Sequence, residues 1–141
     1  MNANDATLTE LATAQSGSMV ADTAPNAPAN GGFDLVMEAV AGSALGSSGA
    51  RYTLTISAID LTAVSQPWPA QTLHQTFDTP SGWKLSGTGP DYECTQTFPI
   101  TVPGDGPGGP LAGHTLQFVA SLVSQGAQIA SIIHSDLFVI V

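Results

Sequence analysis

The chain has 141 residues, only 9% of them charged, and its 11 acidic side chains oppose two basic ones, Arg51 and Lys84, for a formal net charge of -9. Two basic residues cannot neutralise a phosphate backbone or an anionic membrane surface, so the composition excludes nucleic acids and membranes as partners. The apolar fraction of 43% is close to the ordinary value and predicts a folded domain with a substantial core.

The first 32 residues differ in composition from the rest, and we expect residues 1–32 to be a flexible tail. Residues 16–32 are rich in Ser, Ala, Pro, Asn and Gly, as linkers are. Before them, Thr7–Glu10 fits a capping box, which predicts a short helix near residues 7–14. A helix this short is marginal alone, so the tail is either frayed or a docking peptide that folds on a partner.

The N-terminus has neither the basic segment nor the apolar segment of a secretory signal, and no apolar run has the length of a transmembrane helix. These features favour a cytoplasmic location without establishing one.

From Phe33 onward the hydrophobic period is two, which is typical of half-buried strands. The clearest runs are 52–58, 92–102 and 114–122. Shorter predicted strands are 33–40, 73–77, 83–85, 129–133 and 137–141.

Two positions in these runs predict irregular strands. The alternation slips by one residue after Ala58, which predicts a β-bulge near Ala58 and Ile59. Pro99 lacks an amide proton, so its strand should lie at a sheet edge or be bulged there.

Seven to eight short strands separated by Gly- and Pro-rich turns predict an all-β fold. We expect an antiparallel two-sheet β-sandwich, immunoglobulin-like or jelly-roll-like, over residues 33–141.

The sequence contains no motif that assigns a catalytic residue, a metal or a cofactor. His74, His114 and His134 lie on three different predicted strands without the spacing of metal ligands. The single cysteine, Cys94, excludes an internal disulfide and falls on an apolar face, where a thiol is unreactive. A non-enzymatic role is therefore favoured, while an enzyme stays open.

The two tryptophans are the best candidates for ligand contact. Trp68 lies between Pro67 and Pro69, and a rigid, exposed tryptophan is a stacking surface for a sugar or a protein partner. Trp83 follows another turn, and the nearby carboxylates Asp91 and Glu93 complete a candidate carbohydrate site. The alternative is that both tryptophans cover the ends of the core.

The chain ends in five consecutive apolar residues, Leu137, Phe138, Val139, Ile140 and Val141. A run without alternation implies cover on both faces or a partner on one. We expect either a contact between subunits at a free sheet edge, or a central strand covered by a loop such as 103–110.

These features favour a non-catalytic protein-interaction or assembly module, because low charge removes the repulsion and desolvation that keep surfaces apart. The partner would be another protein or a second copy of the chain. The alternatives are a carbohydrate-binding, lectin-like module that uses the tryptophans, and a small enzyme with a pocket between the sheets.

Overall fold

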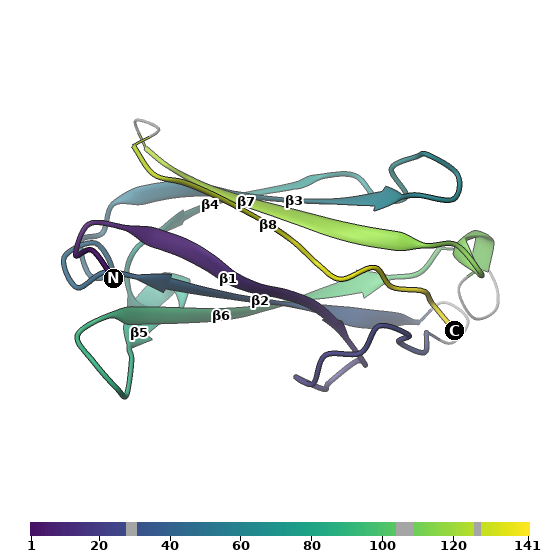
Figure 1. Cartoon of the computed structure of the whole chain (residues 1–141), viewed down its shortest axis with the longest axis horizontal. Helices are drawn as coiled ribbons and strands as arrows, with labels where there is room; N and C mark the ends of the chain where they lie inside the picture. Colours follow the sequence, from purple (N-terminus) through teal and green to yellow (C-terminus); the bar gives the residue numbers. More distant parts are fainter. Residues whose placement is uncertain (28–30, 104–108, 126–127) are drawn as a thin grey trace.

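The computed structural model describes residues 1–27, 31–103, 109–125 and 128–141. In these residues the chain forms two antiparallel four-stranded sheets that pack face to face (Figure 1). The strands are β1 (Ala6–Ala14), β2 (Gly32–Ala41), β3 (Arg51–Asp60), β4 (Gln71–Thr76), β5 (Trp83–Leu85), β6 (Tyr92–Thr101), β7 (Leu116–Ser124) and β8 (Ala130–His134). Two short 3-10 turns, η1 (Thr79–Ser81) and η2 (Gly109–Leu111), lie between them.

We call the sheet of order β1-β2-β6-β5 sheet A and the sheet of order β4-β3-β7-β8 sheet B. The predicted antiparallel sandwich is therefore confirmed. The two strand orders are those of the A-B-E-D and C′-C-F-G sheets of immunoglobulin-type sandwiches, and so match the first of the two expected architectures. No helical segment in the described parts of the chain has the length and hydrophobicity of a membrane span.

The core lies between the sheets and contains two aromatic clusters. Trp83 packs against Tyr52 and Phe77, with ring centroids 6.2 and 5.1 Å away. The second cluster contains Phe33, Trp68, Phe118 and Phe138, in which the Phe118 and Phe138 rings stack at 5.4 Å. Trp83 on β5 pairs with Cys94 on β6, which in turn pairs with Ala39 on β2. Ala39 is six residues along β2 from Phe33, so the two clusters are about 20 Å apart.

The expected helix near residues 7–14 is wrong, because this segment is strand β1, paired with β2 at the edge of sheet A. The register shifts between Leu8 and Glu10, which is a β-bulge. A bulge adds one residue to the strand, so Leu8 and Leu11 both face the core although they are three residues apart. The sandwich thus begins at Ala6 and not at Phe33.

The rest of the expected tail also contacts the domain. The amides of Val139 and Val141 donate to the carbonyls of Thr23 and Pro25, and the amide of Ala27 donates to the carbonyl of Val141. On its other side the C-terminal segment pairs with β7, where Phe138 and Leu116 exchange two backbone bonds of 2.9 Å. Residues 23–27 therefore cover the edge that we expected to be free.

The C-terminal run alternates in the structure in spite of its uniform composition. Phe138 and Ile140 are buried, Val139 is half-buried, and Leu137 and Val141 are exposed. The expected subunit contact at a free edge is thus not supported, since a neighbouring segment of the same chain occupies that edge. Most of the loop 103–110, our alternative cover, lies outside the described residues.

The two expected irregularities have different outcomes. No register shift occurs near Ala58 and Ile59, because β3 pairs with β7 in one register up to Asp60. Asp60, and not Ile59, takes the inward position, so the slip in the apolar pattern reflects a buried carboxylate. β5 pairs only with residues 92–94 of β6, so Pro99 lies in a part of β6 that has no β5 neighbour. The expected edge position of Pro99 is therefore confirmed.

Candidate functional site

The outward-facing side chains of sheet B are uncharged or basic. The strand registers align them in rows across the sheet. Most are Thr, Ser or aliphatic, and no acidic residue is among them in these fully described strands. They are Thr72, His74 and Thr76 on β4, Arg51, Thr53, Thr55, Ser57 and Ile59 on β3, Gln117, Val119, Ser121 and Val123 on β7, and Ala130, Ile132 and His134 on β8.

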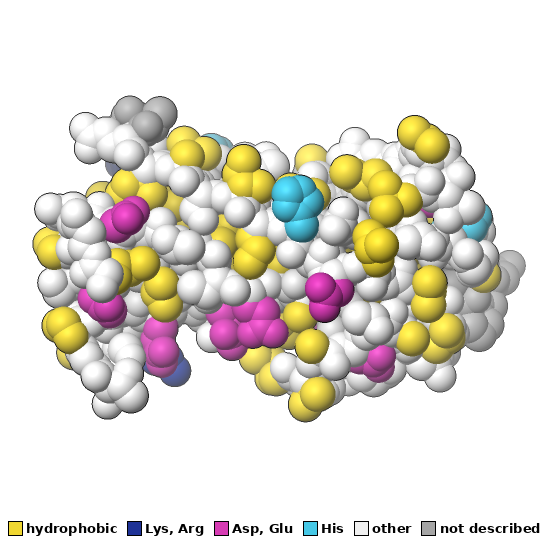
Figure 2. All heavy atoms as spheres, viewed as in Figure 1, with side chains coloured by type: hydrophobic (Ala, Val, Ile, Leu, Met, Phe, Trp, Pro, Cys, Tyr) yellow, Lys and Arg dark blue, Asp and Glu magenta, His cyan; other side chains and the backbone are white. Residues whose placement is uncertain are grey.

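The outward face of sheet A is acidic by contrast. Glu38 on β2 lies directly opposite Glu10 on β1, and Glu93 on β6 lies one row away. Asp34 lies further along β2, and Lys84 on β5 pairs with Glu93 at 4.0 Å. Most of the acidic side chains visible in Figure 2 lie in its lower half, the side on which Figure 1 shows sheet A. The two faces of the sandwich therefore differ in charge.

Crowding of carboxylates changes the titration of Glu38. Partial burial, the charge and hydrogen bond of Glu10, and the charge of Glu93 together raise the pKa of Glu38 above its usual value. The acidic face therefore holds negative charge at an energetic cost, which a cation brought close to it would reduce.

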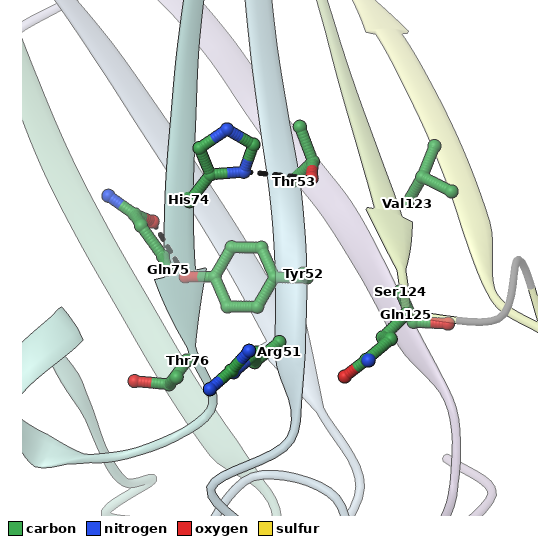
Figure 3. A pocket seen from close by; sticks show the side chains of 9 residues that line it. All are labelled: Arg51, Tyr52, Thr53, His74, Gln75, Thr76, Val123, Ser124 and Gln125. Atoms are coloured by element: carbon green, nitrogen blue, oxygen red, sulfur yellow. Dashed lines mark hydrogen bonds between the residues drawn. The ribbon is translucent and has the colours of Figure 1, made fainter.

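A groove of about 470 Å³ is open on the outward face of sheet B, where β3 begins and β4 and β7 end (Figure 3). Its polar groups come from two strands and the loop after β7: Arg51 and Thr53 on β3, His74 and Thr76 on β4, and Gln125 in the loop. Val123 supplies an apolar wall, and Tyr52, Gln75 and Ser124 complete the lining. The groove is thus a mixed surface with several hydrogen-bond donors and one fixed positive charge.

Arg51 is the centre of this groove. Figure 3 shows its side chain between those of Thr76 and Gln125, and the amide of Gln125 donates to the Arg51 carbonyl at 2.9 Å. Within the described residues, no carboxylate lies within ion-pair distance of the guanidinium. Beside it, Thr53 Oγ1 lies 3.4 Å from Nδ1 of His74. A guanidinium with hydroxyl, imidazole and amide neighbours is suited to bind a carboxylate.

The floor of the groove rests on a buried hydrogen-bond network. Nε1 of Trp83 donates to the Tyr52 hydroxyl at 3.0 Å, and that hydroxyl donates to Oε1 of Gln75 at 2.7 Å. Gln75 and Gln96 exchange amide hydrogen bonds across the two sheets. Burial raises the pKa of Tyr52 to about 12, although its bond from Trp83 acts in the opposite direction. The network fixes β4 against sheet A and thus holds the groove in shape.

Asp60 and His114 form a second polar cluster, away from the groove. The Asp60 carboxylate is 1% exposed, lies 2.5 Å from Nδ1 of His114 and accepts the amides of Thr62 and Ala63. Burial raises the pKa of Asp60, but these bonds outweigh burial and lower it. No hydroxyl or thiol is bonded to His114 among the residues that the structure describes. The pair therefore joins the turn after β3 to the loop before β7.

The four predicted ligand-contact residues do not form one site. Trp83 is 1% exposed and belongs to the core, whereas Trp68 lies in the other aromatic cluster, where it stacks on Phe118 and donates from Nε1 to the Thr101 carbonyl at 2.9 Å. Asp91 pairs with the N-terminal amine at 3.9 Å, and Glu93 pairs with Lys84. The structure thus agrees with our alternative, in which the tryptophans cover the ends of the core.

Cys94 lies on β6, and the three histidines lie on β4, before β7 and on β8. Cys94 is buried, which raises the pKa of its thiol. In the described ranges no group of three His, Cys, Asp or Glu side chains is arranged to hold a metal ion.

Sequence reasoning missed the groove although each of its residues was visible. The signal was the alternation that begins at Arg51, since it places Arg51 and Thr53 on the polar face of their strand. Comparison with protein-family models and with curated proteins finds no match to this sequence. A functional conclusion therefore has to come from the geometry.

Proposed function

We propose that the protein is a non-catalytic protein-interaction module that binds an acidic partner through the outward face of sheet B. The Arg51 groove would receive a carboxylate of that partner. The observation that carries this proposal is an exposed arginine on a face without acidic residues, in a chain with 11 acids. In such a chain the single arginine would usually be neutralised by a neighbour.

The rest of the face supports a protein partner. Ile59, Val123 and Ile132 are 41, 37 and 67% exposed on it, and an aliphatic surface with scattered hydroxyls is typical of a protein contact. Thr, Val and Ile are frequent on this face, and such β-branched side chains are restricted at χ1, so they lose little entropy on binding. A groove with a single histidine and an open mouth gives no comparable support to an enzyme.

Lys84 provides a matched control for the test. It carries the same charge as Arg51, but it lies on the outward face of the other sheet and is paired with Glu93. The two variants Arg51→Ala and Lys84→Ala therefore change the net charge equally and differ only in the face affected.

The experiment is calorimetric titration of the full chain with a short oligoglutamate peptide, with oligoglutamine as the uncharged probe. We expect the wild type to bind oligoglutamate weakly at low salt and Arg51→Ala to lose about tenfold in affinity. Lys84→Ala should bind as well as the wild type or better. Equal losses in the two variants, or equal binding of the two peptides, would contradict the proposal.

A further inference from the structure

The acidic surface that best matches the Arg51 groove is on the same molecule, on the opposite face. Glu10, Glu38 and Glu93 form a cluster on sheet A that has one basic neighbour, Lys84, whose amine is 4.0 Å from Glu93 alone. Lys84 and Glu93 have side chains that are 70 and 44% exposed, so solvent screens this pair strongly. Two of the three carboxylates therefore have no cation near them in the described part of the chain.

The two surfaces cannot meet within one molecule because they face away from each other. They can meet between two molecules that stack in the same orientation, sheet B of one on sheet A of the next. Figure 2 shows the lower outline hollowed beneath a group of acidic side chains, and a long arginine side chain can reach into a recess. Docking would place the guanidinium beside carboxylates that now repel one another, which is favourable electrostatically.

The available area is sufficient for a weak contact. Strands about 4.8 Å apart, with a rise of about 3.4 Å per residue, give each four-stranded face about 500 Å². Specific interfaces commonly bury about 800 Å² on each partner, and transient ones bury less. The 9% charge content also limits the charged surface that must be desolvated.

We propose that the acidic partner of the Arg51 groove is a second copy of this chain, which presents its Glu10–Glu38–Glu93 cluster. This inference rests on the proposed function and names the partner for the same site. The contact joins two different surfaces, so it is heterologous and leaves one free groove and one free cluster at the ends of each pair. Further copies can therefore add, and the assembly grows with concentration.

A heterologous contact can be tested by complementary variants. Arg51→Ala removes the groove's charge but leaves the cluster intact, whereas Glu10→Arg alters the cluster but leaves the groove intact. Glu10 is exposed on β1, so the substitution leaves the core unchanged. Each variant alone should fail to associate, and a mixture of the two should form a dimer that cannot grow.

The measurement is sedimentation velocity over a concentration series at low salt, with far-UV circular dichroism to confirm folding. We expect the wild-type mass to rise with concentration, each single variant to stay monomeric, and the equimolar mixture to reach only the dimer mass. Lys84→Ala changes the net charge as much as Arg51→Ala and should still associate. High salt should weaken the wild-type association because the contact is electrostatic.

Two results would overturn the inference. In the first, the wild type stays monomeric while Arg51 is still needed to bind oligoglutamate. The groove would then bind a different acidic partner, and the proposed function would stand. Association that persists unchanged in Arg51→Ala would show that the copies meet through other surfaces.

Discussion

Arg51 and Lys84 point outward from opposite sheets and have opposite surroundings. The Lys84 amine lies 4.0 Å from Glu93, among the acidic residues of sheet A. Arg51 lies on the outward face of sheet B, whose four described strands carry no acidic side chain there. The positive charge of Lys84 is thus neutralised on sheet A, whereas the positive charge of Arg51 on sheet B is available to bind a partner. This difference gives the molecule two unlike surfaces in spite of its low charge content.

Glu38→Gln should stabilise the protein at neutral pH. The pKa of Glu38 is higher in the folded state than in the unfolded chain, so the unfolded chain loses the Glu38 proton at a lower pH. The free energy of unfolding therefore falls as the pH rises between the two pKa values, and it stays lower above them. Removing a like charge opposite Glu10 should increase the free energy of unfolding by a few tenths to about 1 kcal/mol.

Urea unfolding at several pH values checks this, with Asp136→Asn as a control that removes an equal charge from an exposed position. The gain from Glu38→Gln should vanish below the usual carboxyl range, where the wild-type side chain is protonated in both states. A loss of stability at pH 7 would contradict the assigned repulsion.

Tyr52→Phe should destabilise the fold and change its alkaline behaviour. The variant leaves the buried Trp83 indole N–H without its acceptor, which costs about 1–3 kcal/mol. In the wild type the pKa of Tyr52 is about 12, above the usual 10, so between these values only the unfolded chain loses the proton and stability falls as pH rises. The variant should lack this part of the decline.

Thermal unfolding from pH 8 to 12 measures both effects. Tyr92→Phe keeps the ring and leaves the network untouched, so it should retain the steeper wild-type decline. Identical alkaline profiles for Tyr52→Phe and the wild type would show that the Tyr52 hydroxyl is not held in the network.

Leu11→Ala tests whether β1 belongs to the core. Leu11 is 4% exposed against sheet B, so its truncation should cost about 2–5 kcal/mol. Thr7→Ala, at an exposed position in the same strand, should change stability by less than about 0.5 kcal/mol. Chemical denaturation of both variants measures this, and equal stabilities would mean that residues 6–14 do not pack on the domain.

Phe138→Ala and Leu137→Ser distinguish a core role from an interface role for the C-terminal segment. Phe138 is 2% exposed and stacks on Phe118, so its loss should cost about 3–5 kcal/mol, whereas the exposed Leu137 should be tolerated. Neither change should alter the solution mass of the folded protein. A lower solution mass for Leu137→Ser would instead support the contact between subunits that we expected from the sequence.

The sandwich could be predicted because most strands alternate without interruption. Residues 52–58 and 92–102 show this, since one face of each meets the core and the other meets water. Prediction failed where one residue changed the period. The bulge after Leu8 gave β1 a spacing typical of a helix, and the buried Asp60 made β3 look slipped.

The candidate site could be predicted only in part. Alternation places Arg51 and Thr53 on one face, but the approach of His74, Thr76 and Gln125 depends on which strands are neighbours. The charge difference between the faces has the same origin, because Glu10 and Glu38 become neighbours only through the β1–β2 register. Pairing between distant segments is not encoded in any local pattern.

The most direct measurement is an amide chemical-shift map of the isotope-labelled chain during titration with oligoglutamate, at a concentration where the chain is monomeric. Binding at the groove predicts progressive shifts at Arg51, Thr53, His74, Thr76 and Val123, and none at Lys84 or Glu93 on the other sheet. The Arg51→Ala variant should lose these shifts. Shifts concentrated on sheet A, or spread evenly over both faces, would contradict recognition through the outward face of sheet B.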